Sequence, residues 1–220
     1  IPLWNAYSFF VTYANIDGYV PSSTPTSSLS NPLDKWIISD LEKLVKKATD
    51  AFDSYMIQDA TEALLSFIDD LNNWYIRRSR RRFWRSENDG DKKEAYDTLY
   101  RVLMTVVKVA CPMVPFVTEA IYQNLKTASD PESVHLCFYP EYNEEERDFK
   151  LEEEMNIIMK TIEMGRALRA SSNLKVRQPL KEFVVVSRNS AHRENLEKNR
   201  DIILEELNVK NVKVRGDESD

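Results

Sequence analysis

The spacing of the apolar residues is the feature that most restricts how this chain can fold. Over residues 1–125, apolar side chains recur at steps of three and four, and short stretches containing Pro, Gly or Ser interrupt them. This spacing gives an α-helix one apolar face, and short connections between such helices favour antiparallel neighbours. We therefore expect residues 1–127 to form an antiparallel helical bundle.

Helix start and stop signals divide this region into segments. Asn31 is a suitable N-cap, Pro32 takes the first helical position, and Pro112 and Pro115 separate the last two helices. The expected helices cover residues 1–14, 31–55, 57–84, 92–110 and 115–125. In the first of them, Trp4, Tyr7, Phe10 and Tyr13 keep helical spacing and form an aromatic face.

The pattern changes after Thr127. Residues 134–139, 183–187 and 209–214 are predicted to be strands, and residues 144–171 and 194–207 are predicted to be helices. We expect a small α+β unit over residues 128–220, after the bundle. The expected fold class is mainly α.

Composition excludes several function classes. Two cysteines, Cys111 and Cys137, and two histidines have no zinc-ligand spacing, and no basic residue next to either cysteine in sequence would activate it. The chain has no phosphate-binding glycine loop and no Ser, His and Asp set, so we expect neither catalytic nor metal-binding residues. Free thiols suit a reducing compartment, and we expect no membrane segment and a cytoplasmic location.

The strongest functional signal is a run of arginines at the end of the third expected helix. The net charge of the chain is −6, which argues against indiscriminate nucleic-acid binding, but local charge steers ligands. Guanidinium groups this close repel one another, and phosphates would offset the repulsion. The candidate residues for contact with RNA are Arg77, Arg78, Arg80, Arg81, Arg82 and Arg85, with the neighbouring rings of Trp74, Tyr75 and Trp84.

A structural explanation of the arginine run is also open. Cations are favoured at a helix C-terminus, and acidic residues in 54–70 or 144–154 would then be their partners. A second, weaker basic segment follows later in the chain. Arg166 and Arg169 lie one turn apart and would form a phosphate clamp, and Lys175 and Arg177 would share one face of an extended segment. The alternative for this segment is an ordinary polar loop.

Several motifs resemble the isoleucyl-tRNA synthetases, in the form shared by eukaryotes and some bacteria. The resemblance lies in residues 4–10, 73–84 and 174–180, and the segment 73–84 is its most specific part. Residues 110–116 with Glu119 resemble a signature of the isoleucine, valine and leucine enzymes, and residues 133–136 with Pro140 resemble the segment that follows it.

The resemblance implies the anticodon-binding helical domain and the start of the C-terminal region of a class I synthetase. The full enzyme would join isoleucine to its tRNA through an aminoacyl-adenylate, using ATP and Mg. The chain lacks the His-x-Gly-His and Lys-Met-Ser-Lys-Ser signatures, so we expect a piece of a longer protein, without activity or a cofactor of its own. Its expected partners are isoleucine tRNA and the catalytic and editing domains of the same protein.

Two alternatives remain. In one, the arginine-rich helix docks onto another domain while tRNA is contacted elsewhere. In the other, the chain is a helical interaction module that binds an acidic protein surface and no RNA.

Overall fold

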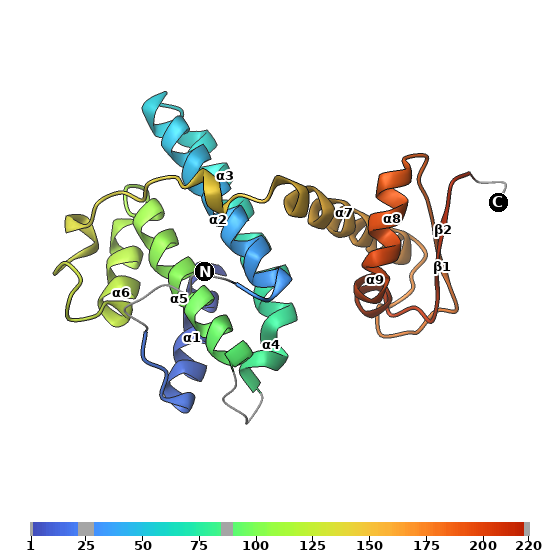
Figure 1. The fold of residues 1–220 in the computed structure, drawn as a ribbon, viewed down its shortest axis with the longest axis horizontal. Helices are drawn as coiled ribbons and strands as arrows, with labels where there is room; N and C mark the ends of the chain where they lie inside the picture. Colours follow the sequence, from blue (N-terminus) through green and yellow to red (C-terminus); the bar gives the residue numbers. More distant parts are fainter. Residues whose placement is uncertain (1, 22–28, 85–89, 218–220) are drawn as a thin grey trace. The chain divides into compact units, whose positions relative to one another are not determined.

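The structure is a computed structural model that describes residues 2–21, 29–84 and 90–217 (Figure 1). Its contacts divide the chain into two compact units, residues 1–148 and 149–220. The first unit contains helices α1 (Pro2–Asp17), α2 (Pro32–Asp53), α3 (Ile57–Asp70), α4 (Arg77–Trp84), α5 (Gly90–Ala110) and α6 (Pro115–Leu125). The predicted helical bundle is therefore confirmed.

Helix α2 begins where the capping residues predict. The side chain of Asn31 accepts a hydrogen bond from the Leu33 backbone N–H, and Pro32 occupies the first helical position. At the other end, the Met56 N–H donates to the Ala51 carbonyl across Tyr55, which has a φ of 57°. This turn reverses the chain, so that α3 packs antiparallel along α2.

Residues 57–84 are helical throughout, as predicted, but not as one regular α-helix. A π-helix, Leu71–Ile76, joins α3 to α4. It buries Trp74 and Tyr75 and keeps the core face of α3 aligned with that of α4. Phe83 of α4 then packs edge-on against Phe9 of α1 and Tyr96 of α5.

The segment after α6 packs with the helical unit. The predicted strand at residues 134–139 is wrong, because Val134–Leu136 is a short 3-10 helix capped by Ser133. Glu119 of α6 accepts from the Ser133 hydroxyl and the Val134 N–H, and these bonds replace those of a strand partner. Further on, Glu42 of α2 accepts from the Asn143 N–H at 2.9 Å. These contacts place residues 128–148 in the first unit, whereas the sequence suggested a boundary after Thr127.

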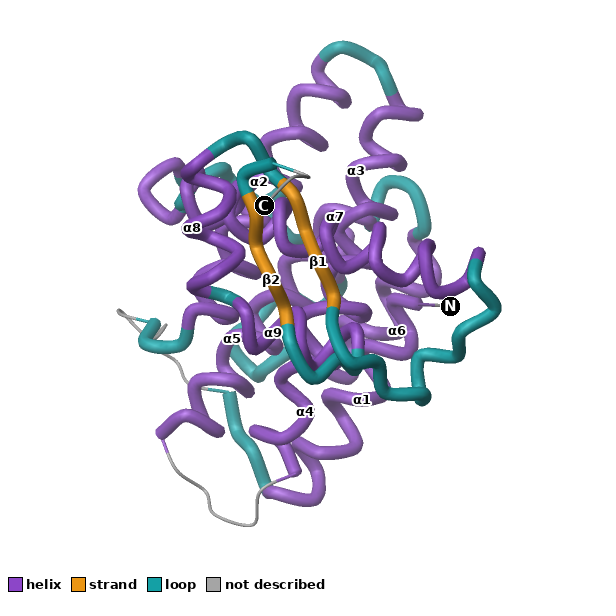
Figure 2. The backbone as a smooth tube through the Cα atoms, turned by 90° about the vertical axis from the view of Figure 1, so that its right-hand side faces the viewer, coloured by secondary structure: helices purple, strands orange, loops and turns teal. Residues whose placement is uncertain are grey.

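The second unit is a small α+β structure. Its elements are α7 (Phe149–Ser171), β1 (Phe183–Val186), α8 (Ser190–Lys198), α9 (Arg200–Leu207) and β2 (Val212–Arg215). The two strands pair in parallel, with Phe183 opposite Val212 and Val186 opposite Arg215 (Figure 2). The crossover between them carries α8 and α9, as a parallel connection requires.

Two expected helices of this region differ from prediction. Residues 144–146 form a separate 3-10 helix, and α7 begins only at Phe149. The predicted helix at residues 194–207 is two helices that break at Asn199, whose side chain donates back to Asn195. In the described part of the chain, no helix is both long enough and apolar enough to cross a bilayer.

Candidate nucleic-acid interface

Helix α4 carries most of the candidate arginines, and it divides them between its buried and exposed faces. Arg82 is buried, with 7% of its surface exposed, and Arg78 is half-buried. Arg77, Arg80 and Arg81 are exposed. Arg85 lies outside the described residues. The run is therefore two sets of side chains with different surroundings.

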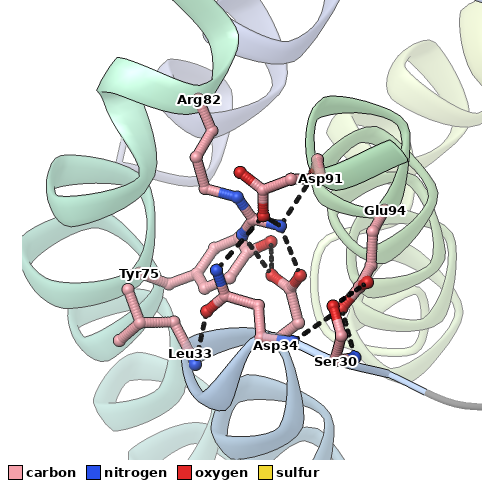
Figure 3. A network of polar contacts seen from close by, with 8 residues as sticks. Ser30, Leu33, Asp34, Tyr75, Arg82, Asp91 and Glu94 are labelled. Atoms are coloured by element: carbon pink, nitrogen blue, oxygen red, sulfur yellow. Dashed lines mark hydrogen bonds and ion pairs between the residues drawn. The ribbon is translucent and has the colours of Figure 1, made fainter. Parts of the chain in front are cut away.

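Arg82 reaches inward and pairs with Asp34 in the first turn of α2 (Figure 3). Its Nη1 and Nη2 lie 2.8 and 2.7 Å from the two carboxylate oxygens of Asp34, which has no exposed surface. The hydroxyl of Tyr75 donates to the same carboxylate at 2.7 Å. This bidentate geometry matches the planar guanidinium, and its donors face the protein interior. Arg82 and Tyr75 therefore hold α4 within the fold, and their predicted contact with RNA stays a prediction.

The network continues into helix α5. The guanidinium of Arg82 also binds Asp91, through the backbone carbonyl and the carboxylate, both at 2.9 Å. Glu94 accepts from the Ser30 N–H and hydroxyl and from the Asn31 N–H (Figure 3). Together these contacts tie α4 to the N-termini of α2 and α5.

Burial shapes the electrostatics of this network. Desolvation raises the pKa of the Asp34 carboxyl, and the guanidinium of Arg82 opposes that rise. Burial alone would lower the pKa of Arg82, but the hydrogen bonds and charge of Asp34 raise it above its ordinary value. Burial also raises the pKa of the Tyr75 hydroxyl well above its ordinary value. Arg82 therefore stays cationic and Tyr75 neutral across the physiological range.

The outer side of α4 presents an aromatic ring beside the exposed arginines. Trp84 is 56% exposed, and its Nε1 donates to the Tyr13 hydroxyl of α1 at 2.7 Å. This bond fixes the indole against α1 and leaves much of the ring uncovered. Trp74, by contrast, is buried and packs inside the bundle.

The second basic segment also contains a buried arginine. Arg169 is 4% exposed, and its guanidinium donates to the backbone carbonyls of Lys175, Gln178, Leu207 and Asn208. Arg166 pairs with Glu206 of α9. Both guanidinium groups of the predicted phosphate clamp therefore have partners within the second unit, and phosphate binding by Arg166 and Arg169 stays a prediction.

Lys175 and Arg177 remain exposed, but in a different backbone conformation from the one predicted. The Gln178 N–H donates to the Lys175 carbonyl at 2.9 Å, which closes a turn. The segment is thus a turn and not an extended stretch, although both cationic side chains face solvent.

Cys111 has a partner that the sequence did not indicate. Its Sγ lies 3.1 Å from Nδ1 of His135. Burial nevertheless raises the pKa of the Cys111 thiol, so the pair does not form an activated thiolate. Within residues 2–21, 29–84 and 90–217, no three His, Cys, Asp or Glu side chains are grouped so that they could hold a metal ion.

Sequence reasoning missed the residues that anchor α4. In the sequence, Asp34 is an ordinary acid in the first turn of a helix, and Asp91 and Glu94 carry no signal of their own. The sequence does contain a signal for the buried arginine. The apolar stripe of α3 continues at helical spacing through Leu71 and Tyr75 to Arg82. A guanidinium on a buried stripe requires a buried carboxylate as its partner.

Helix α4 is anchored in the bundle by one buried guanidinium group and carries others on its exposed side. Such a helix is suited to binding anions such as phosphate groups. The sequence matches a family described as the anticodon-binding domain of tRNA ligase, over residues 34–184. The chain belongs to this family.

Curated relatives share this sequence closely. It is 51% identical to the isoleucine–tRNA ligase of Treponema denticola, over 96% of this chain and 20% of the relative. It is 44% identical to the enzyme of the same name from Protochlamydia amoebophila, over 100% of this chain and 21% of the relative. For the one from Dehalococcoides mccartyi, the identity is 46% over 96% of this chain and 21% of the relative. The chain thus spans about one fifth of the length of these relatives.

Proposed function

We propose that this chain is the tRNA-binding part of an isoleucine–tRNA ligase and that it holds the anticodon stem-loop side of isoleucine tRNA. The observation that carries the proposal is the set of exposed guanidinium groups on α4, Arg77, Arg80 and Arg81, beside the exposed ring of Trp84. Guanidinium groups bind phosphates bidentately, and exposed rings stack on unpaired bases.

The remaining parts of this proposal concern the longer protein. The complete ligase would activate isoleucine with ATP and Mg and transfer it to tRNA, in the cytoplasm. Catalytic and editing domains of the same polypeptide would be the chain's other partners. The chain itself would supply tRNA affinity and no chemistry.

A second function for the arginine-rich helix is docking. The pairing of Arg82 with Asp34 and Asp91 favours it, since this arginine already joins three helices. On this alternative, the exposed arginines of α4 would bind another protein surface and RNA would be contacted elsewhere.

Binding of this chain to tRNA transcripts tests the proposal. Isoleucine tRNA and an unrelated tRNA would be titrated at several salt concentrations, with fluorescence anisotropy as the readout. We expect salt-dependent binding, and a preference for isoleucine tRNA would place part of the anticodon recognition within this chain. Absence of binding at low salt would contradict the proposal and favour docking.

A further inference from the structure

The two-stranded sheet of the second unit has one covered face and one open face. Phe183 and Val212 pair in register on the inner face, where Val212 is buried and α8 and α9 contact β2. Val184 pairs with Lys213 and Val186 pairs with Arg215, which places these four side chains on the opposite face. Within the described residues of the second unit, the helices lie on one side of the two strands (Figure 2), and the two valines are 41% and 42% exposed.

Basic residues are frequent in the segments that form and flank the two strands. The segments 172–188 and 208–215 carry seven basic residues and one acid, whereas the three helices of the unit carry more acids than bases. Six of these basic residues form what we call the sheet-side surface: Lys175, Arg177, Lys181, Lys210, Lys213 and Arg215. All are exposed except Arg215, which is half-buried.

Hydrogen bonds bring the two basic segments together. Asn208 donates to the Val176 carbonyl at 2.9 Å, and the Lys210 N–H donates to the Leu180 carbonyl at 2.9 Å. Arg169 binds carbonyls on both sides of this junction. The turn that contains Lys175 and Arg177 is therefore fixed beside the start of β2.

The single acid of these segments does not neutralise the surface. Glu182 pairs with Lys213 at 3.0 Å and accepts from Asn211. Both charged side chains of this pair are partly exposed, and exposed pairs contribute little stability. A phosphate can therefore replace Glu182 as the partner of Lys213 at small cost.

We propose that the sheet-side surface is a second RNA-binding surface that contacts phosphates of the tRNA, in addition to the exposed arginines of α4. This inference rests on the proposed function and extends it to residues of the second unit. Lysine and arginine side chains neutralise phosphates, and the exposed valines provide apolar contact for sugars. RNA fits better than an acidic protein, because the apolar part of the surface lacks the large aromatic side chains typical of protein interfaces.

Two matched double variants test the inference. Lys213→Ala with Arg215→Ala removes two charges from the open face, and Lys150→Ala with Lys160→Ala removes two exposed charges from α7. Affinity for a labelled isoleucine tRNA transcript would be measured against salt concentration. We expect the slope of log K against log salt to fall by about 1.4 to 1.8 for the sheet variant, at roughly 0.7 to 0.9 for each phosphate contact. The α7 control keeps the wild-type slope.

The outcomes separate this inference from the proposed function. An unchanged slope for the sheet variant, together with weakened binding on loss of Arg80 and Arg81, overturns the inference and leaves the proposed function standing. Absence of tRNA binding by the wild-type chain overturns both. If poly-glutamate binds and depends on Lys213 and Arg215 more strongly than tRNA does, the surface is specific for acidic protein and the RNA assignment fails.

Lysine footprinting of the wild-type chain avoids dependence on the folding of a variant. Acetylation of Lys181, Lys210 and Lys213 would be compared with and without the tRNA by peptide mass spectrometry. We expect severalfold protection of these lysines and none of Lys150 and Lys160. Equal acetylation of all five lysines with and without bound tRNA would overturn the inference.

Discussion

Asp34 and Arg82 form a buried bidentate ion pair between the start of α2 and the end of α4, with N–O distances of 2.8 and 2.7 Å. The arginines of α4 therefore do not form one cationic surface. Arg82 is buried and anchors the helix, whereas Arg77, Arg80 and Arg81 are exposed. Because the anchor fixes α4 against α2 and α5, the displayed side chains project from a rigid helix.

Replacement of Arg82 by alanine is expected to destabilise the bundle by about 3–5 kcal/mol. The substitution leaves the Asp34 carboxylate buried without its cation, and an uncompensated buried charge is costly. Urea denaturation monitored by circular dichroism measures this loss. Arg80→Ala removes an exposed side chain of the same helix and should change stability by less than about 0.5 kcal/mol. Equal effects of the two substitutions would contradict the division of the run.

Asn31→Ala is expected to cost about 1 kcal/mol of stability. Asn31 caps α2 by accepting from the Leu33 N–H at 2.9 Å, and alanine leaves that donor without its partner. Asn31→Ser restores a capping oxygen and should recover most of the loss. Thermal denaturation of both variants checks this, and a serine variant as unstable as the alanine variant would show that the cap is not the cause.

The stability of the helical unit should fall as pH rises from about 4 to about 7. Burial and the nearby carboxylate of Asp40 raise the pKa of Asp70 to about 7. A carboxyl with a raised folded-state pKa favours the folded state below its unfolded value, and this contribution is lost as pH rises through the folded value. Asp70→Asn should therefore reduce this pH dependence and stabilise the protein at pH 8 by roughly 1–2 kcal/mol, allowing for solvent screening.

Exposed Asp59 provides the control for that measurement. Because Asp59 is exposed, Asp59→Asn should not stabilise the protein at pH 8 as Asp70→Asn does. A profile for Asp70→Asn that runs parallel to the wild-type profile would contradict the raised pKa.

Arg169→Ala should loosen the junction between α7, the Lys175–Gln178 turn and the end of α9. Its guanidinium binds four backbone carbonyls, and alanine removes the donor group that holds these carbonyls together. Hydrogen exchange is expected to quicken in β1 and β2 while α2 and α5 stay protected. Arg169→Lys should not rescue the structure, because an ammonium group lacks the fork that spans these carbonyls. Full rescue by lysine would contradict this role.

Local signals predicted most of the helical unit. The Asn31 cap, the proline stops and the spacing of apolar residues place α2, α5 and α6 within a few residues of their observed bounds. These features act through backbone bonds and side chains close in sequence, which is why they can be read from it.

The failures involve contacts between residues far apart in sequence. Residues 134–139 have β-forming side chains, but Glu119 binds the backbone there and fixes a 3-10 turn. The roles of Arg82 and Arg169 depend on Asp34 and on carbonyls near residue 207, 48 and 38 positions away. The spacing of residues shows where arginines cluster along the chain. It does not show which of these arginines pair with buried groups and which stay exposed.

The salt dependence of tRNA binding to a variant with Arg80→Ala and Arg81→Ala tests the central claim most directly. The matched control is Lys46→Ala with Lys47→Ala, which removes two exposed charges from α2 of the same unit. With both variants folded, we predict that the slope of log K against log salt falls by about 1.4 to 1.8 for the arginine variant only. An arginine variant that binds isoleucine tRNA with the wild-type affinity and slope would contradict the claim that α4 displays its arginines to RNA.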